Sequence, residues 1–198
     1  KAAEKNRKLP EEVDMHIKHG NSLVDDETID KNAFNWKGDF QEGSFDTIIG
    51  NPPYVFTRDV EFQGSFKDYT TKNYLNASDS ISKSHARQSG KVNLYALFLI
   101  KSIKLLKNHG LFGFIIPNNI LRTTTYDIIR KFILDNCKVL KIVDLGAGVF
   151  EGVTASTIIL ILEKENDKIK RDKNKVTIYS DINNDLRTGN FSNASFQC

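Results

Sequence analysis

The sequence predicts an α/β fold built on a mixed sheet, and three observations lead to this expectation. The chain has 198 residues, of which 39% are hydrophobic and 27% are charged, and this composition suits one domain with a core. Strand-length apolar runs alternate along the chain with stretches of helical period. The runs 139–145 and 157–162 are separated by too few residues for a helical crossover, so we expect them to pair as an antiparallel hairpin.

Each expected element follows from its own residues. Short apolar runs bounded by Gly, Pro or polar residues indicate strands, and apolar side chains at helical spacing indicate helices. In the stretch 91–110, Lys101, Lys104 and Lys107 mark the wet side of a helix that Gly110 is expected to end. The expected strands are 15–17, 45–49, 111–116, 139–145, 157–162 and 175–179, and the expected helices are 91–110 and 124–136.

Composition and charge narrow the class of protein. The net charge of +3 is mildly basic, which permits nucleic-acid binding without proving it. Cys137 and Cys198 are too few and too far apart for a disulfide framework or a zinc site, so we expect a reducing, cytoplasmic compartment. The four histidines show no ligand spacing, and we expect no metal. The longest apolar runs have the length of strands, so no membrane partner is expected.

The most informative stretch is 45–55, which reads FDTIIGNPPYV. An apolar strand ends here in a stiff polar and aromatic corner. Asn51 supplies an amide that can donate and accept hydrogen bonds, and Pro52 and Pro53 fix two φ angles. Tyr54 offers an aromatic face. An amide, a rigid carbonyl and a ring at the carboxyl end of a strand can hold a flat heterocycle that carries an amino group.

This corner resembles the N-P-P-Y signature of S-adenosylmethionine-dependent amino-methyltransferases, above all the adenine-specific DNA methyltransferases of restriction–modification systems. RNA and protein methyltransferases carry the motif too, and an inactive DNA-binding module could retain the fold. The block NLYALF at 93–98, followed by a helix and by GLFGFIIP at 110–117, favours the DNA family. The resemblance implies a Rossmann-like methyltransferase fold whose mixed sheet ends in an antiparallel hairpin.

The resemblance also implies roles for the residues of the corner. The side-chain oxygen of Asn51 and the carbonyl of Pro52 would accept the two amine hydrogens of a flipped-out adenine, next to Pro53. Tyr54 would stack on the base, and Phe150, in the loop GVFEGVTAS, would pack against it from the hairpin. A Phe that plugs the core end of the loop is the alternative. Double-stranded DNA is the expected partner.

The methyl donor S-adenosylmethionine is the cofactor that the resemblance implies. Asn51 and Pro53 would contact it, and so would Asn21, which follows the expected strand 15–17. An ordinary Gly-Asn turn explains Asn21 equally well. The sequence VDLGAG at 143–148 looks like a donor-binding glycine loop, but no helix fits between it and the strand beginning at Thr157, so we expect it to belong to the hairpin instead.

The segment 55–90 is a long polar stretch in which basic residues alternate with aromatic ones. Basic groups among aromatics suit phosphates and unstacked bases, so Arg58, Lys72 and Arg87 are candidates for contacts with the DNA backbone. A solvated surface loop is the plainer interpretation. For Asn93 and Tyr95, which open the helix after this segment, bracing of the corner competes with helix capping and core packing.

No donor-binding glycine loop precedes the corner, and the chain begins at Lys1 without an initiator Met. We therefore expect 1–179 to be a catalytic methyltransferase domain truncated at its N-terminus, with an incomplete sheet. Residues 180–198 are expected to be a linker or the start of a DNA-recognition region. The chain alone is expected to be inactive, and a fused or separate restriction nuclease is a further expected partner.

Overall fold

The fold was analysed in a computed structural model that describes residues 17–36, 40, 43–56, 65–75, 92–150 and 155–180. Arg58 and Arg87, the expected strand residues Met15 and His16, and residues 181–198 lie outside this part. The described elements are β1 (Phe45–Gly50), α3 (Ser65–Thr70), the π-helix η1 (Thr71–Leu75), α5 (Leu94–Leu105), β2 (Leu106–Pro117), the 3₁₀ turns η3 (Asn118–Leu121) and η4 (Thr124–Tyr126), α6 (Asp127–Asn136), β3 (Cys137–Gly146), β4 (Thr157–Lys164), α7 (Lys168–Asp172) and β5 (Thr177–Tyr179).

The described strands form a five-stranded mixed sheet in the order β1-β2-β4-β3-β5. β1 runs parallel to β2, and β5 runs parallel to β3. β4 lies antiparallel between β2 and β3, with Ile158 opposite both Ile116 and Asp144. The expected hairpin is therefore confirmed, and the VDLGAG segment lies at its turn rather than before a crossover helix.

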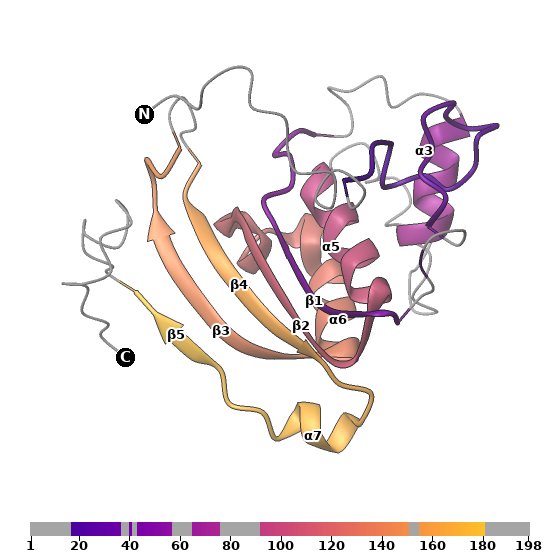
Figure 1. Ribbon diagram of the computed structural model, residues 1–198. Coiled ribbons are helices and arrows are strands. Elements are labelled where there is room, and N and C mark those ends of the chain that lie inside the picture. Colours follow the sequence, from indigo (N-terminus) through magenta and orange to yellow (C-terminus); the bar gives the residue numbers. More distant parts are fainter. Residues whose placement is uncertain are drawn as a thin grey trace, which may run out of the picture.

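The core lies between this sheet and the helices α5 and α6, which cover one of its faces (Figure 1). Alternate residues of the two central strands point into it, and the buried pairs are Phe112 with Leu162, Phe114 with Leu160, and Ile116 with Ile158. Burying one such side chain contributes about 1.5–3 kcal/mol. The carboxyl ends of β1 and β2 are thereby fixed side by side.

The expected helix 91–110 was too long at both ends, and Gly110 does not end it. α5 ends at Leu105, where the Lys164 ammonium donates to the carbonyls of Lys104 and Leu106 at 3.3 and 2.6 Å. Gly110 lies in β2 instead, and a Cβ there would come within 3.0 Å of the Phe45 carbonyl oxygen. That close approach, rather than a helix stop, requires the glycine.

β1 is the outer strand of the described sheet, and its second face is open. Ile48 packs against the core, whereas Ile49 is 82% exposed. Leu111, on the same open face of β2, is 44% exposed. A parallel strand with apolar residues on both faces is typical of a strand that is covered on both sides. None of the described helices is long and apolar enough to cross a membrane.

Candidate active site

The N-P-P-Y corner follows β1 directly and combines exposed and anchored residues. Asn51 and Pro53 are exposed, Pro52 is buried, and Tyr54 is half-buried. Within the described part of the chain, the Asn51 side chain forms no hydrogen bond. Its amide is therefore available to a ligand at the end of the strand.

Gly50 sets the path of the chain into this corner through its small size. A Cβ at this position would lie 2.8 Å from Cε1 of Phe114, a buried ring on the neighbouring strand. Because real carbon atoms do not approach so closely, a side chain here would force the Phe114 ring or the strand to shift. The glycine lets the strand end pack tightly, which holds Asn51 in place.

Tyr54 is fixed from several directions. Its hydroxyl donates to the carbonyl of Ile115 at 2.8 Å, which ties the corner to β2. Its ring meets that of Tyr95 edge-on, with 6.4 Å between centroids and 87° between planes. Burial raises the pKa of Tyr54 to about 12, so the hydroxyl stays protonated and donates at physiological pH.

The structure brings Phe150 to the same place. Its ring centroid lies 6.2 Å from that of Tyr54, with 68° between the planes. Phe150 follows β3 in the hairpin loop. Gly146, the last residue of β3, and Gly148, in the loop, adopt positive φ angles of 68° and 79°. Two residues that are almost a hundred positions apart in sequence therefore meet at the predicted base site.

The first turn of α5 is attached to the corner. The Leu94 N–H donates to the Val55 carbonyl at 2.8 Å, and Phe56 and Asn93 form an isolated bridge. Asn93 also caps the helix by accepting from the Tyr95 N–H at 3.3 Å. Capping and bracing, the two alternatives for Asn93, are both present.

Asn21 lies in a turn that its own side chain stabilises. Its amide nitrogen donates to Asp30 at 2.7 Å, and its amide oxygen accepts from the Leu23 N–H at 3.1 Å. The backbone bridges to Ala33. This geometry matches the turn interpretation, and a contact with the donor stays a prediction.

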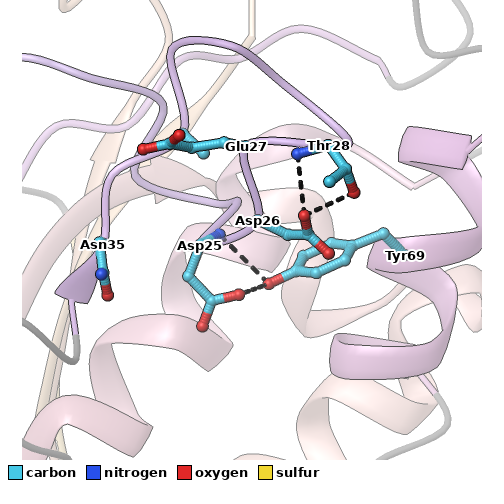
Figure 2. A pocket seen from close by; sticks show the side chains of 7 residues that line it. Asp25, Asp26, Glu27, Thr28, Asn35 and Tyr69 are labelled. Atoms are coloured by element: carbon cyan, nitrogen blue, oxygen red, sulfur yellow. Dashed lines mark hydrogen bonds between the residues drawn. The ribbon is translucent and has the colours of Figure 1, made fainter.

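A separate pocket of about 420 Å³ lies beside this turn, lined by Asp25, Asp26, Glu27, Thr28, Ala33, Asn35 and Tyr69. In Figure 2 the Tyr69 hydroxyl donates to the Asp25 carboxylate and accepts from the Asp25 N–H. Burial raises the pKa of Tyr69 to about 12, with Asp25 adding to the effect. The residues of the N-P-P-Y corner do not line this pocket.

Lys72 is exposed on η1, where it can reach a solvent-borne phosphate, so its DNA contact stays a prediction.

A different charged cluster was not predicted from the sequence, because its members are distant in the chain. His109 Nδ1 lies 3.2 Å from Glu163 and 3.7 Å from Glu165. Lys138 lies 3.0 Å from both carboxylates and so offsets part of their charge.

Comparison with solved structures defines the class of the fold. The chain superposes on a structure from Listeria monocytogenes described as a class I S-adenosylmethionine-dependent methyltransferase, with a TM-score of 0.50 and 22% identity over 67% of this chain and 35% of that one. It also superposes on the DrdV–DNA complex with a TM-score of 0.50 and 18% identity, over 76% of this chain and 17% of that one. The fold is that of the S-adenosylmethionine-dependent methyltransferases, as the sequence predicted.

Sequence comparison then gives the family. Residues 2–150 match the family described as Eco57I restriction-modification methylase, and the chain belongs to that family. It is 32% identical to the type II restriction enzyme and methyltransferase RM.Eco57I of Escherichia coli, over 78% of this chain and 15% of the relative. It is 27% identical to the type II methyltransferase M.AccI of Acinetobacter calcoaceticus, over 88% of this chain and 33% of the relative. The chain thus spans a third or less of these two relatives.

Proposed function

We propose that this chain is the catalytic and base-binding part of a methyltransferase that transfers a methyl group to the exocyclic amine of a flipped-out adenine in double-stranded DNA, within a restriction–modification system. One observation carries the proposal. At the end of β1 an exposed amide without a described protein partner, Asn51, lies three residues before Tyr54, whose ring is in contact with that of Phe150. Family membership supports the same reaction class.

The residues of the corner suit the chemistry of an aromatic amine. The amine lone pair of adenine is delocalised into the ring, and inside a duplex the ring is stacked, so the base must be turned out at a cost of about a few kcal/mol. The Asn51 side-chain oxygen and the Pro52 carbonyl would accept the two amine hydrogens and so favour a tetrahedral nitrogen with a free lone pair. Tyr54 would hold one face of the base by stacking.

The donor S-adenosylmethionine supplies an electrophilic methyl group when it is bound. Asn51 and Pro53, both exposed at the strand end, fit a donor on that side of the corner. Asn21 fits less well, because the protein already engages both ends of its amide. The chain would orient the base and the donor so that the methyl group moves in one direct displacement. On its own, we expect the chain to be inactive.

The test measures methyl transfer by this chain together with the part of the protein that binds the donor. Radiolabelled donor is offered with DNA, RNA and protein substrates. Asn51→Ala should lower turnover by about 10²–10³-fold, because a group that stabilises developing charge is lost. Binding of DNA should change little. Asn32→Ala, which also removes an exposed amide, is the matched control and should retain full activity.

The outcomes separate the alternatives. Activity of Asn51→Ala within about twofold of wild type would contradict the role of Asn51, since a lost oxyanion-type contact costs far more. Label on RNA or protein in place of DNA would support the alternative substrate classes. DNA binding by the wild type without any transfer would support an inactive module that retains the fold.

A further inference from the structure

The contacts that hold Tyr54 continue into Tyr95 and Asn119. Tyr95 is fully buried in the first turn of α5, and its ring meets Tyr54 edge-on at 6.4 Å. The Tyr95 hydroxyl donates to Oδ1 of Asn119 at 2.8 Å, and Asn119 lies in η3, the turn after β2. Tyr95 therefore connects the corner after β1 to the turn after β2.

The Tyr95 ring itself has little freedom. Tyr126 packs on it at 5.5 Å between centroids, and Asn93 accepts the Tyr95 N–H as the cap of the helix. Burial raises the pKa of Tyr95 strongly, so its hydroxyl remains a donor. A buried ring that is fixed on its face and at its hydroxyl can orient a neighbouring ring.

The geometry of Tyr54 shows why a lateral contact is needed. The hydroxyl oxygen of Tyr54 lies on the axis about which the ring turns, so its hydrogen bond to Ile115 fixes the end of the ring more firmly than the ring plane. Contacts at the sides of the ring set the plane, and the described ring pairs of Tyr54 with Tyr95 and with Phe150 are contacts of this kind. A base that enters between Tyr54 and Phe150 removes the second contact and leaves Tyr95.

We propose that Tyr95, anchored by Asn119, is a positioning residue that sets the plane of the Tyr54 ring for stacking on the extruded base. The proposal rests on the function proposed above. Tyr95 is buried and acts through Tyr54 rather than on the base. Because a misplacement of about 1 Å can cost about 10²-fold in rate, a Tyr54 ring that is free to turn would lower the rate of transfer more than the affinity for DNA.

The first experiment measures the Tyr54 ring without requiring activity. The 198-residue chain is labelled with 3-fluorotyrosine, and the ¹⁹F signal of Tyr54 is assigned by its loss in Tyr54→Phe. In Tyr95→Leu this signal should move toward the value of free fluorotyrosine, and in Asn119→Ala it should move in the same direction by less. Phe112→Leu is the control, since it removes another fully buried ring that forms no described ring pair with Tyr54 or Tyr95.

An unchanged Tyr54 signal in Tyr95→Leu, or an equal change in Phe112→Leu, would overturn the proposal. Circular dichroism shows which variants are folded. If Tyr95→Leu unfolds, Asn119→Ala decides, because it breaks the anchor at a half-buried position and leaves both rings in place.

The second experiment measures single-turnover methyl transfer by the protein with its donor-binding part. Tyr95→Leu should lower the rate constant for transfer by about 10–10²-fold, with the half-saturating DNA concentration within about threefold of that of wild type. A wild-type rate in Tyr95→Leu would overturn the positioning role and leave the proposed function standing. An inactive wild type with a Tyr54 signal that still responds to Tyr95→Leu would instead overturn the function, while the ring contact stands.

Discussion

At the scale of single residues, the corner combines a side chain that forms no described hydrogen bond with a ring that the protein restrains. Asn51 is exposed and has no hydrogen-bond partner in the described part of the chain, whereas Tyr54 is restrained at its hydroxyl and at its ring. The free amide can bind a substrate amine without first breaking a bond within the protein. The restrained ring loses little entropy when a base stacks on it. Both properties favour binding of a planar amine.

The contact between Tyr54 and Phe150 leads to a prediction about entry of the base. A base between two rings needs two contacts of about 3.5–4 Å, or about 7–8 Å between the ring planes. The centroids are 6.2 Å apart, so Phe150 must move aside when the base enters. An edge-on ring pair contributes about 0.5–1.5 kcal/mol, and stacking of a base contributes about 1–3 kcal/mol. Packing against the base therefore outweighs the ring contact that is lost.

Phe150→Ala should accordingly weaken binding of the extruded adenine more than it weakens overall DNA binding. With 2-aminopurine at the target position, the fluorescence increase on binding should fall, while the affinity measured by anisotropy stays within about threefold, since most of the affinity comes from phosphate contacts. Val149→Ala, in the same loop, is the control. An unchanged 2-aminopurine signal in Phe150→Ala would assign Phe150 to the core-plug alternative.

At the scale of elements, the sequence predicted features that depend on local length and period. The β3–β4 hairpin was predictable because the loop after Gly146 is too short for a helix. The end of α5 was not predictable from the local sequence, because it depends on Lys164, about 60 residues away in sequence. The cluster around His109 depends in the same way on β4, and the meeting of Tyr54 with Phe150 was expected only through the family resemblance.

The junction of β1 with β2 provides a test at this scale. Gly50→Ala would place a methyl group 2.8 Å from the Phe114 ring, which itself packs at 4.2 Å on Phe112 in the core. The neighbours must shift, and such overpacking costs about 1–3 kcal/mol. Gly113→Ala on the adjacent strand is the matched control, because its Cβ meets nothing within 4 Å.

Urea unfolding of both variants measures the difference. We expect a clearly lower midpoint for Gly50→Ala and a midpoint near that of wild type for Gly113→Ala. Equal midpoints would show that the Phe114 ring adjusts without cost, and that Gly50 is not required for the close packing of the strand end.

At the scale of the whole molecule, the described part of the chain has a sheet with helices packed on one face. Helices α5 and α6 cover one face of the sheet (Figure 1), while Ile49 and Leu111 are exposed on the other. A parallel β1–β2 pair is normally covered on both faces. The donor-binding glycine loop of the family has no counterpart in the sequence before the corner. We therefore propose that the donor site is completed by chain outside these 198 residues.

Titration calorimetry tests this proposal directly. The 198-residue chain should show no saturable binding of S-adenosylmethionine at concentrations up to about 1 mM, which corresponds to a binding free energy weaker than about 4 kcal/mol. Asn51 and Pro53 alone offer too few contacts to reach that value. Saturable binding would mean that the chain holds a donor site of its own. The pocket beside Tyr69 would then be the first place to examine, and loss of binding in Asp25→Asn with retention in Asn51→Ala would assign the site to that pocket.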